Sequence, residues 1–145
     1  MSRLLISALS KCEKRQKKIV SKEKGMKHTA NNLKACNVRQ YEIDGGVITG
    51  NQSVKCDYLV LNDDKRVAYF IELKRTSHIS EAVDQIQTTI EMLKAELPGY
   101  IYHGRIVSNA IHGVRDSKTI ELFKKYRKKY KGIIDHKSKH FEENI

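Results

Sequence analysis

The chain has 145 residues, of which 39% are hydrophobic and 31% charged, and its formal net charge is +11. This length and composition are typical of one folded domain, and no apolar run approaches the ~20 residues that a membrane-spanning helix needs. We therefore predict a single domain over residues 1–145 that lacks a signal peptide and a membrane contact and lies in the cytoplasm.

The charge is unevenly distributed along the chain. Residues 1–28 carry a net charge of +7 and residues 117–145 carry +5, whereas residues 29–116 carry −1. A slightly acidic centre between basic ends is what a metal site within a polyanion-binding surface produces, so we predict nucleic acid as the partner. The alternative is that the lysine-rich faces are simply solvated.

Cysteine and histidine show no metal-binding spacing. The three cysteines are far apart in the sequence and include no C-x-x-C pair, which argues against a zinc or iron–sulfur site. The six histidines include no H-x₃-H pair on a predicted helix. His78 lies just after the central hairpin and is interpreted as a loop residue without a role.

The first 35 residues predict helical structure. Residues 3–18 carry a narrow apolar stripe, typical of a basic helix or arm that occupies residues 1–20. Residues 19–35 are interpreted as a second helix or its continuation, with Gly25 as a break. Glu23 lies in this segment, where it can pair with Lys27 four residues later.

Three strands are predicted in the centre of the chain. Residues 38–48 read as a strand with a turn or bulge at Asp44-Gly45-Gly46. Residues 54–61 and 67–73 are rich in aliphatic and aromatic side chains and are joined by a polar turn at residues 62–65, which indicates a β-hairpin. Glu42 and Asp44 are interpreted as strand-surface residues near this hairpin.

Charged side chains interrupt the apolar pattern at one end of the hairpin. Because side chains alternate faces along a strand, Glu72 and Lys74 share one face, and antiparallel pairing places Asp57 across from them. Two adjacent carboxylates repel each other unless a cation lies between them, and Mg²⁺ prefers one or two carboxylates with water and phosphate oxygens. A neighbouring lysine can orient a water molecule or offset charge on the phosphate. The alternative is a strand end at which Glu72 pairs with Lys74 or Arg75.

Two helices and a strand complete the prediction. The apolar spacing over residues 79–97 predicts a helix that ends at Pro98-Gly99. Residues 100–110 predict a fourth strand, residues 117–131 a basic helix, and residues 133–145 a polar, mobile tail. The buried stripe of the basic helix is expected to consist of Ile120, Phe123, Tyr126 and Tyr130.

Asp57, fourteen intervening residues and then Glu72-Leu73-Lys74 resemble the signature of the PD-(D/E)XK nuclease superfamily. The predicted order of elements also agrees with the αβββαβ core of that superfamily, so the resemblance covers roughly residues 20–110. It implies an α/β, restriction-endonuclease-like fold with a central mixed sheet of about four strands, flanked by helices, as in small RecB-like or Holliday-junction-resolvase-like members. Cys56 stands where the family often has proline.

The resemblance implies metal-dependent hydrolysis of phosphodiester bonds. Asp57, Glu72 and the backbone carbonyl of Leu73 would hold Mg²⁺ or Mn²⁺, and Lys74 would orient the attacking water. A glutamine of the following helix would assist, and Gln85 matches that position, with Gln87 as the fallback.

The same resemblance implies a further acidic ligand from the first part of the chain, for which Glu23 is the first candidate and Glu13 the second. Arg75 and the basic helix would grip the phosphate backbone, more often of DNA than of RNA, and a homodimer is expected by analogy. The candidate lysines of that helix are Lys124, Lys125 and Lys128. Two alternatives remain open: a non-catalytic nucleic-acid-binding module on the same fold, and a small basic RNA-associated protein in which the motif is incidental.

Overall fold

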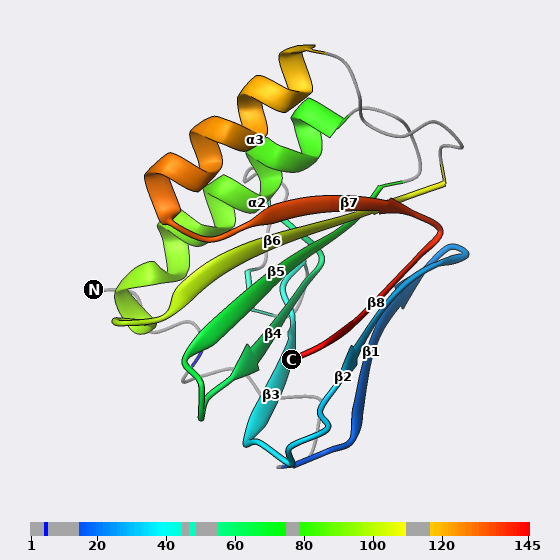
Figure 1. The fold of residues 1–145 in the computed structure, drawn as a ribbon, viewed down its shortest axis with the longest axis vertical. Helices are drawn as coiled ribbons and strands as arrows, with labels where there is room; N and C mark the ends of the chain where they lie inside the picture. Colours follow the sequence, from blue (N-terminus) through cyan, green and yellow to red (C-terminus); the bar gives the residue numbers. More distant parts are fainter. Residues whose placement is uncertain (1–4, 6–14, 45–46, 49–54, 75–78, 110–116) are drawn as a thin grey trace.

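The computed structural model describes residues 5, 15–44, 47–48, 55–74, 79–109 and 117–145. These residues form an α/β structure with mixed sheets, which confirms the predicted fold class (Figure 1). None of the helices in this part of the chain is long and apolar enough to cross a membrane. The elements are β1 (Lys18–Glu23), β2 (Met26–Asn31), β3 (Val38–Glu42), β4 (Tyr58–Asn62), β5 (Val67–Lys74), α2 (Ile79–Leu93), the 3₁₀ turn η1 (Lys94–Glu96), β6 (Ile101–Ser108), α3 (Ser117–Tyr130), β7 (Ile134–Ser138) and β8 (His140–Asn144).

The larger sheet has five strands in the order β3-β4-β5-β6-β7. The first three strands are antiparallel neighbours, whereas β5, β6 and β7 run parallel to one another. Helix α2 connects β5 to β6, α3 connects β6 to β7, and the two helices lie side by side on one face of the sheet (Figure 1). The order strand, strand, strand, helix, strand, helix agrees with the sequence prediction from its first strand onward, and β7 is an additional strand. The prediction of one central sheet of about four strands is wrong, because the described strands form two sheets, of five and three strands.

A smaller sheet, in the order β1-β2-β8, lies against the other face of the larger one (Figure 1). Alternate residues of the central strands therefore enter two different cores. Phe70 and Ile106 pack with α2, whereas Tyr69 and Ile71 pack with β1 and β2. This two-sided burial explains why six of the eight side chains of β5 are buried.

The predicted helix over residues 19–35 is wrong, because this segment forms the β1–β2 hairpin. Lys24 and Gly25 both have positive φ angles, 51° and 84°, as a two-residue hairpin loop requires. The glycine that we interpreted as a helix break is thus a turn residue. The predicted helix over residues 3–18 lies mostly outside the described residues; Leu5 is helical and buried, and Lys18 already belongs to β1.

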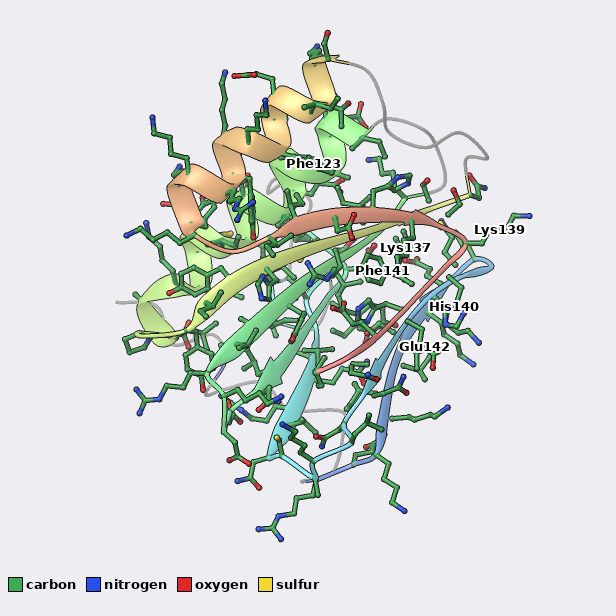
Figure 2. All side chains as sticks on the ribbon, viewed as in Figure 1. Phe123, Lys137, Lys139, His140, Phe141 and Glu142 are labelled. Atoms are coloured by element: carbon green, nitrogen blue, oxygen red, sulfur yellow. The ribbon has the colours of Figure 1, made fainter. Side chains whose placement is uncertain are left out.

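The prediction of a polar, mobile tail over residues 133–145 is also wrong. Strand β7 extends the larger sheet and β8 completes the smaller one, so the end of the chain joins the two sheets. Phe141 points toward the larger sheet, whereas His140 and Glu142 point away from it (Figure 2). These two strands contain few apolar residues, so the sequence gives little sign of them. Polar contacts hold much of β8 in place instead.

One such polar contact is a buried ionic cluster. Glu143 of β8 receives hydrogen bonds from Arg105 of β6, at 2.7 and 3.0 Å, and is 2.7 Å from His28 Nε2 of β2. Burial alone would raise the pKa of Glu143, but the bonds to His28 and Arg105 lower it to about 2. Paired charges of this kind make the position of β8 specific, because each partner would otherwise be buried alone.

The buried stripe predicted for the basic helix is only partly correct. Tyr126 is fully buried, and its hydroxyl donates to the carbonyl of Tyr102 at 2.7 Å. Phe123 and Tyr130 are half-buried, and Phe123 lies on the side of α3 that faces α2 (Figure 2). Ile120 is 44% exposed and does not belong to the core.

We expect Phe141→Ala to lower the free energy of unfolding by about 3–5 kcal/mol, because it empties a buried aromatic site between the two sheets. Glu142→Ala changes the neighbouring, outward-facing side chain and serves as the control. Urea unfolding followed by circular dichroism measures both. If the tail did not fold onto the sheets, both variants would change the free energy of unfolding by equal, small amounts.

Candidate active site

Asp57, Glu72 and Lys74 lie at one end of the β4–β5 pair, as the alternation of strand faces predicts. Tyr58 pairs with Ile71, so that Asp57 comes next to Glu72. The backbone N–H of Leu73 donates to Asp57 Oδ2 at 2.8 Å and fixes this carboxylate at the strand end. Because the N–H and C=O of a strand residue face the same neighbour, the Leu73 carbonyl also faces the edge where Asp57 lies.

Helix α2 positions the lysine. Lys74 Nζ donates to Gln85 Oε1 at 3.0 Å and lies 3.0 Å from Glu81 Oε2. Gln85 in turn donates to the carbonyl of Lys55 at 3.3 Å, which ties α2 to the segment before β4. Gln85, rather than Gln87, is thus the helix glutamine that contacts Lys74. The sequence analysis did not identify Glu81, which lies one helical turn before Gln85.

The Glu72 carboxyl group is buried and the neighbouring Asp57 carboxyl group is half-buried. Glu72 is only 4% exposed, and its Oε1 has no hydrogen-bond partner among the described residues. Burial raises the pKa of Glu72 far above its ordinary value, and the neighbouring Asp57 raises it further, while Lys74 opposes the shift. Burial also raises the pKa of Asp57, although the Leu73 N–H opposes this. Since the two side chains share a hydrogen bond, the pair retains a proton when no cation is present.

A cavity of about 200 Å³ opens beside Asp57. Glu23 lines it from the end of β1, although the sequence placed this residue on a helix, and its charge raises the pKa of both Asp57 and Glu72. Glu42 and Asp44 line the same cavity, whereas we interpreted them as surface residues. Asp44 also lies 3.7 Å from the ammonium of the buried Lys55. The remaining lining residues are Lys22 and Tyr58.

This donor set suits one kind of metal. Within the described part of the chain, no three Asp, Glu, His or Cys side chains are grouped so as to hold an ion by themselves. Mg²⁺ keeps several waters and needs only one or two carboxylates, so the Asp57–Glu72 pair with the Leu73 carbonyl fits it. The unpartnered Glu72 Oε1 is the atom that such an ion would satisfy.

A second polar pair lies beside Lys74 and was not found from the sequence. Ser108 of β6 is the register partner of Lys74, and its hydroxyl lies 2.6 Å from His136 Nε2 of β7. Burial lowers the pKa of His136, which favours the neutral imidazole. The sequence analysis placed His136 in a mobile tail, and it therefore did not connect this residue with the hairpin.

The remaining predicted site residues lie elsewhere. Lys124, Lys125 and Lys128 are exposed on α3. Arg75, His78 and Glu13 lie outside the described residues.

Comparison of the chain with protein-family models, with curated proteins and with solved structures gives no match. The class of the protein is therefore argued from the geometry above and from the resemblance of its motif.

The carboxyl pair makes stability depend on pH. Because the pKa of Glu72 is raised to about 9, the folded protein binds more protons than the unfolded chain, and its stability decreases as the pH rises from about 4 to about 9. We expect Glu72→Gln to increase the free energy of unfolding at pH 8, without divalent ions, by at least about 1.4 kcal/mol, the equivalent of one pKa unit. Denaturant unfolding at pH 5 and pH 8 measures the effect.

Glu121→Gln is the matched control, since Glu121 is exposed on α3. Mg²⁺ should raise the melting temperature of the wild type at pH 8 and leave that of Glu72→Gln unchanged. If the stability of the wild type and that of Glu72→Gln depended on pH to the same extent, the raised pKa of Glu72 would be contradicted.

Proposed function

We propose that the chain is a divalent-cation-dependent nuclease that hydrolyses phosphodiester bonds of nucleic acid, DNA in preference to RNA. The observation that carries the proposal is the adjacent pair of the half-buried Asp57 and the buried Glu72, with Lys74 on the same strand face two residues beyond Glu72. The proposal includes a restriction-endonuclease-like core made of β3, β4, β5, α2 and β6. Three antiparallel strands, a helix and a parallel strand support it, because they follow in the order that the superfamily has after its first helix. In place of that helix, residues 19–35 contain the β1–β2 hairpin.

Each residue has a separate part in the proposed reaction. Mg²⁺ or Mn²⁺, when bound, would polarise the phosphate and lower the pKa of a water. Asp57, Glu72 and the Leu73 carbonyl would hold the ion, and the Leu73 N–H keeps Asp57 in place. Lys74 would orient the attacking water and offset negative charge on the phosphate. Gln85 would hold the Lys74 ammonium in position.

The Lys74 contacts also favour a second candidate, a nucleic-acid-binding module without hydrolysis. Lys74 is engaged by Glu81 and Gln85, so its ammonium is already paired without substrate. In this candidate the carboxyl pair would stay protonated and would only shape the site. A homodimer that presents two sites to two strands belongs to the nuclease proposal by analogy alone. The cytoplasmic location remains a prediction from the sequence.

We expect the wild type to cleave DNA with Mg²⁺ or Mn²⁺ and not with EDTA. Glu72→Gln, Asp57→Asn and Lys74→Ala should each reduce the rate at least about a hundredfold, because each removes an ion ligand or the group that orients the water. Plasmid nicking and degradation of labelled duplex, single-stranded DNA and RNA measure the rate and the substrate preference.

The matched controls are Glu91→Gln and Lys94→Ala, which change an exposed ion pair (2.7 Å) at the other end of α2. Cleavage that persists in both Glu72→Gln and Lys74→Ala would refute the nuclease proposal. Tight binding without cleavage in any metal would select the second candidate.

A further inference from the structure

Five exposed lysines surround the end of the molecule at which the carboxyl pair lies. Three are on the β1–β2 hairpin, near its turn, and two are at the corner between β7 and β8. We call this surface the lysine rim; it consists of Lys22, Lys24, Lys27, Lys137 and Lys139. None of these elements was expected from the sequence, which placed a helix and a mobile tail here.

Backbone contacts connect the rim to the site. The N–H of Lys27 donates to the carbonyl of Lys139 at 2.9 Å, so the hairpin touches the corner. The N–H of Lys139 donates to the carbonyl of Ser108 at 2.7 Å, and Ser108 is the register partner of Lys74. Figure 2 shows Lys139 extending outward from this corner. On the hairpin side, Lys22 itself lines the acidic cavity beside Asp57.

The lysines of the rim do not contribute to the stability of the strands and turns that carry them. Lys22 lies directly opposite Lys27 in the β1–β2 register, and like charges in that position destabilise a sheet. Lys24 and Lys139 have φ angles of 51° and 62°, a backbone region that asparagine and glycine adopt more readily. Some charge is offset, since Lys27 acts on Glu142 and Lys137 lies 4.6 Å from the ring centre of Phe141.

We propose that the lysine rim binds the phosphate backbone of the nucleic acid that enters the site. This inference rests on the proposed nucleic-acid partner and names the surface that holds it. A row of ammonium groups next to an acidic cavity attracts a polyanion and leaves the cation-binding carboxylates accessible to one phosphate.

The rim replaces the basic face of α3 as the principal contact surface. Helix α3 follows β6 in the chain and runs toward the end of the larger sheet at which β7 begins (Figure 1). Lys124 follows Ser117 by seven residues, so at 1.5 Å per residue it lies about 10 Å along the helix, and Lys128 lies farther. A strand seated at the carboxyl pair therefore meets the rim first.

The test compares two variants of the full chain that lose the same charge. One is Lys24→Gln/Lys27→Gln/Lys139→Gln in the rim, and the other is Lys124→Gln/Lys125→Gln/Lys128→Gln on α3. Fluorescence anisotropy with a short labelled duplex, and with its single strand, gives the Kd in EDTA over a range of NaCl concentrations. Circular dichroism and melting curves check that both variants fold.

We expect the rim variant to lower the slope of log Kd against log salt by about 3, or roughly 0.9 for each lost phosphate contact, and the α3 variant by less than about 1. Equal effects of the two variants, an effect of the α3 variant alone, or no binding by the wild type would overturn the rim proposal. Loss of binding in the rim variant together with no cleavage by the wild type would leave the rim standing and refute the nuclease. Cleavage by the wild type, together with unchanged DNA binding by the rim variant, would support the nuclease and refute the rim.

Discussion

The interaction on which the account depends is the contact between two carboxyl groups, that of the half-buried Asp57 and that of the buried Glu72. Bringing two acids together away from water is unfavourable, and the shared hydrogen bond requires that one of them keep its proton. A divalent cation would remove this repulsion and would satisfy Glu72 Oε1, which has no partner among the described residues. This is why we propose that the pair holds an ion.

The architecture builds this contact from three layers. The larger sheet supplies the two acids from adjacent strands, and α2 supplies Gln85, which orients Lys74. The smaller sheet adds Glu23 to the cavity wall. Its position depends on the buried cluster of Arg105, Glu143 and His28, so a polar network remote from the acids helps to determine the shape of the site.

The central hairpin and α2 could be predicted from the sequence because their signals are local. Strand alternation is sufficient to place Glu72 and Lys74 on one face, and the helical spacing is sufficient to predict α2. The choice of Gln85 within that helix came from the resemblance. The β1–β2 hairpin and the β7–β8 end could not be predicted, since their inward positions include Ser21, His28 and Glu143. Such residues are expected to be exposed until their long-range partners are known, which are Gln40 for Ser21, Glu143 for His28 and Arg105 for Glu143. Glu23 was predicted on a helix, but it lies at the end of β1 and lines the cavity beside Asp57.

The most direct measurement is an anomalous difference map from crystals of the protein soaked in Mn²⁺. The account requires a peak in contact with one oxygen of Asp57 and one of Glu72, beside the Leu73 carbonyl, with water at the remaining positions. A map without density between the two carboxylates at saturating Mn²⁺, or with the ion only at exposed acids elsewhere, would contradict it.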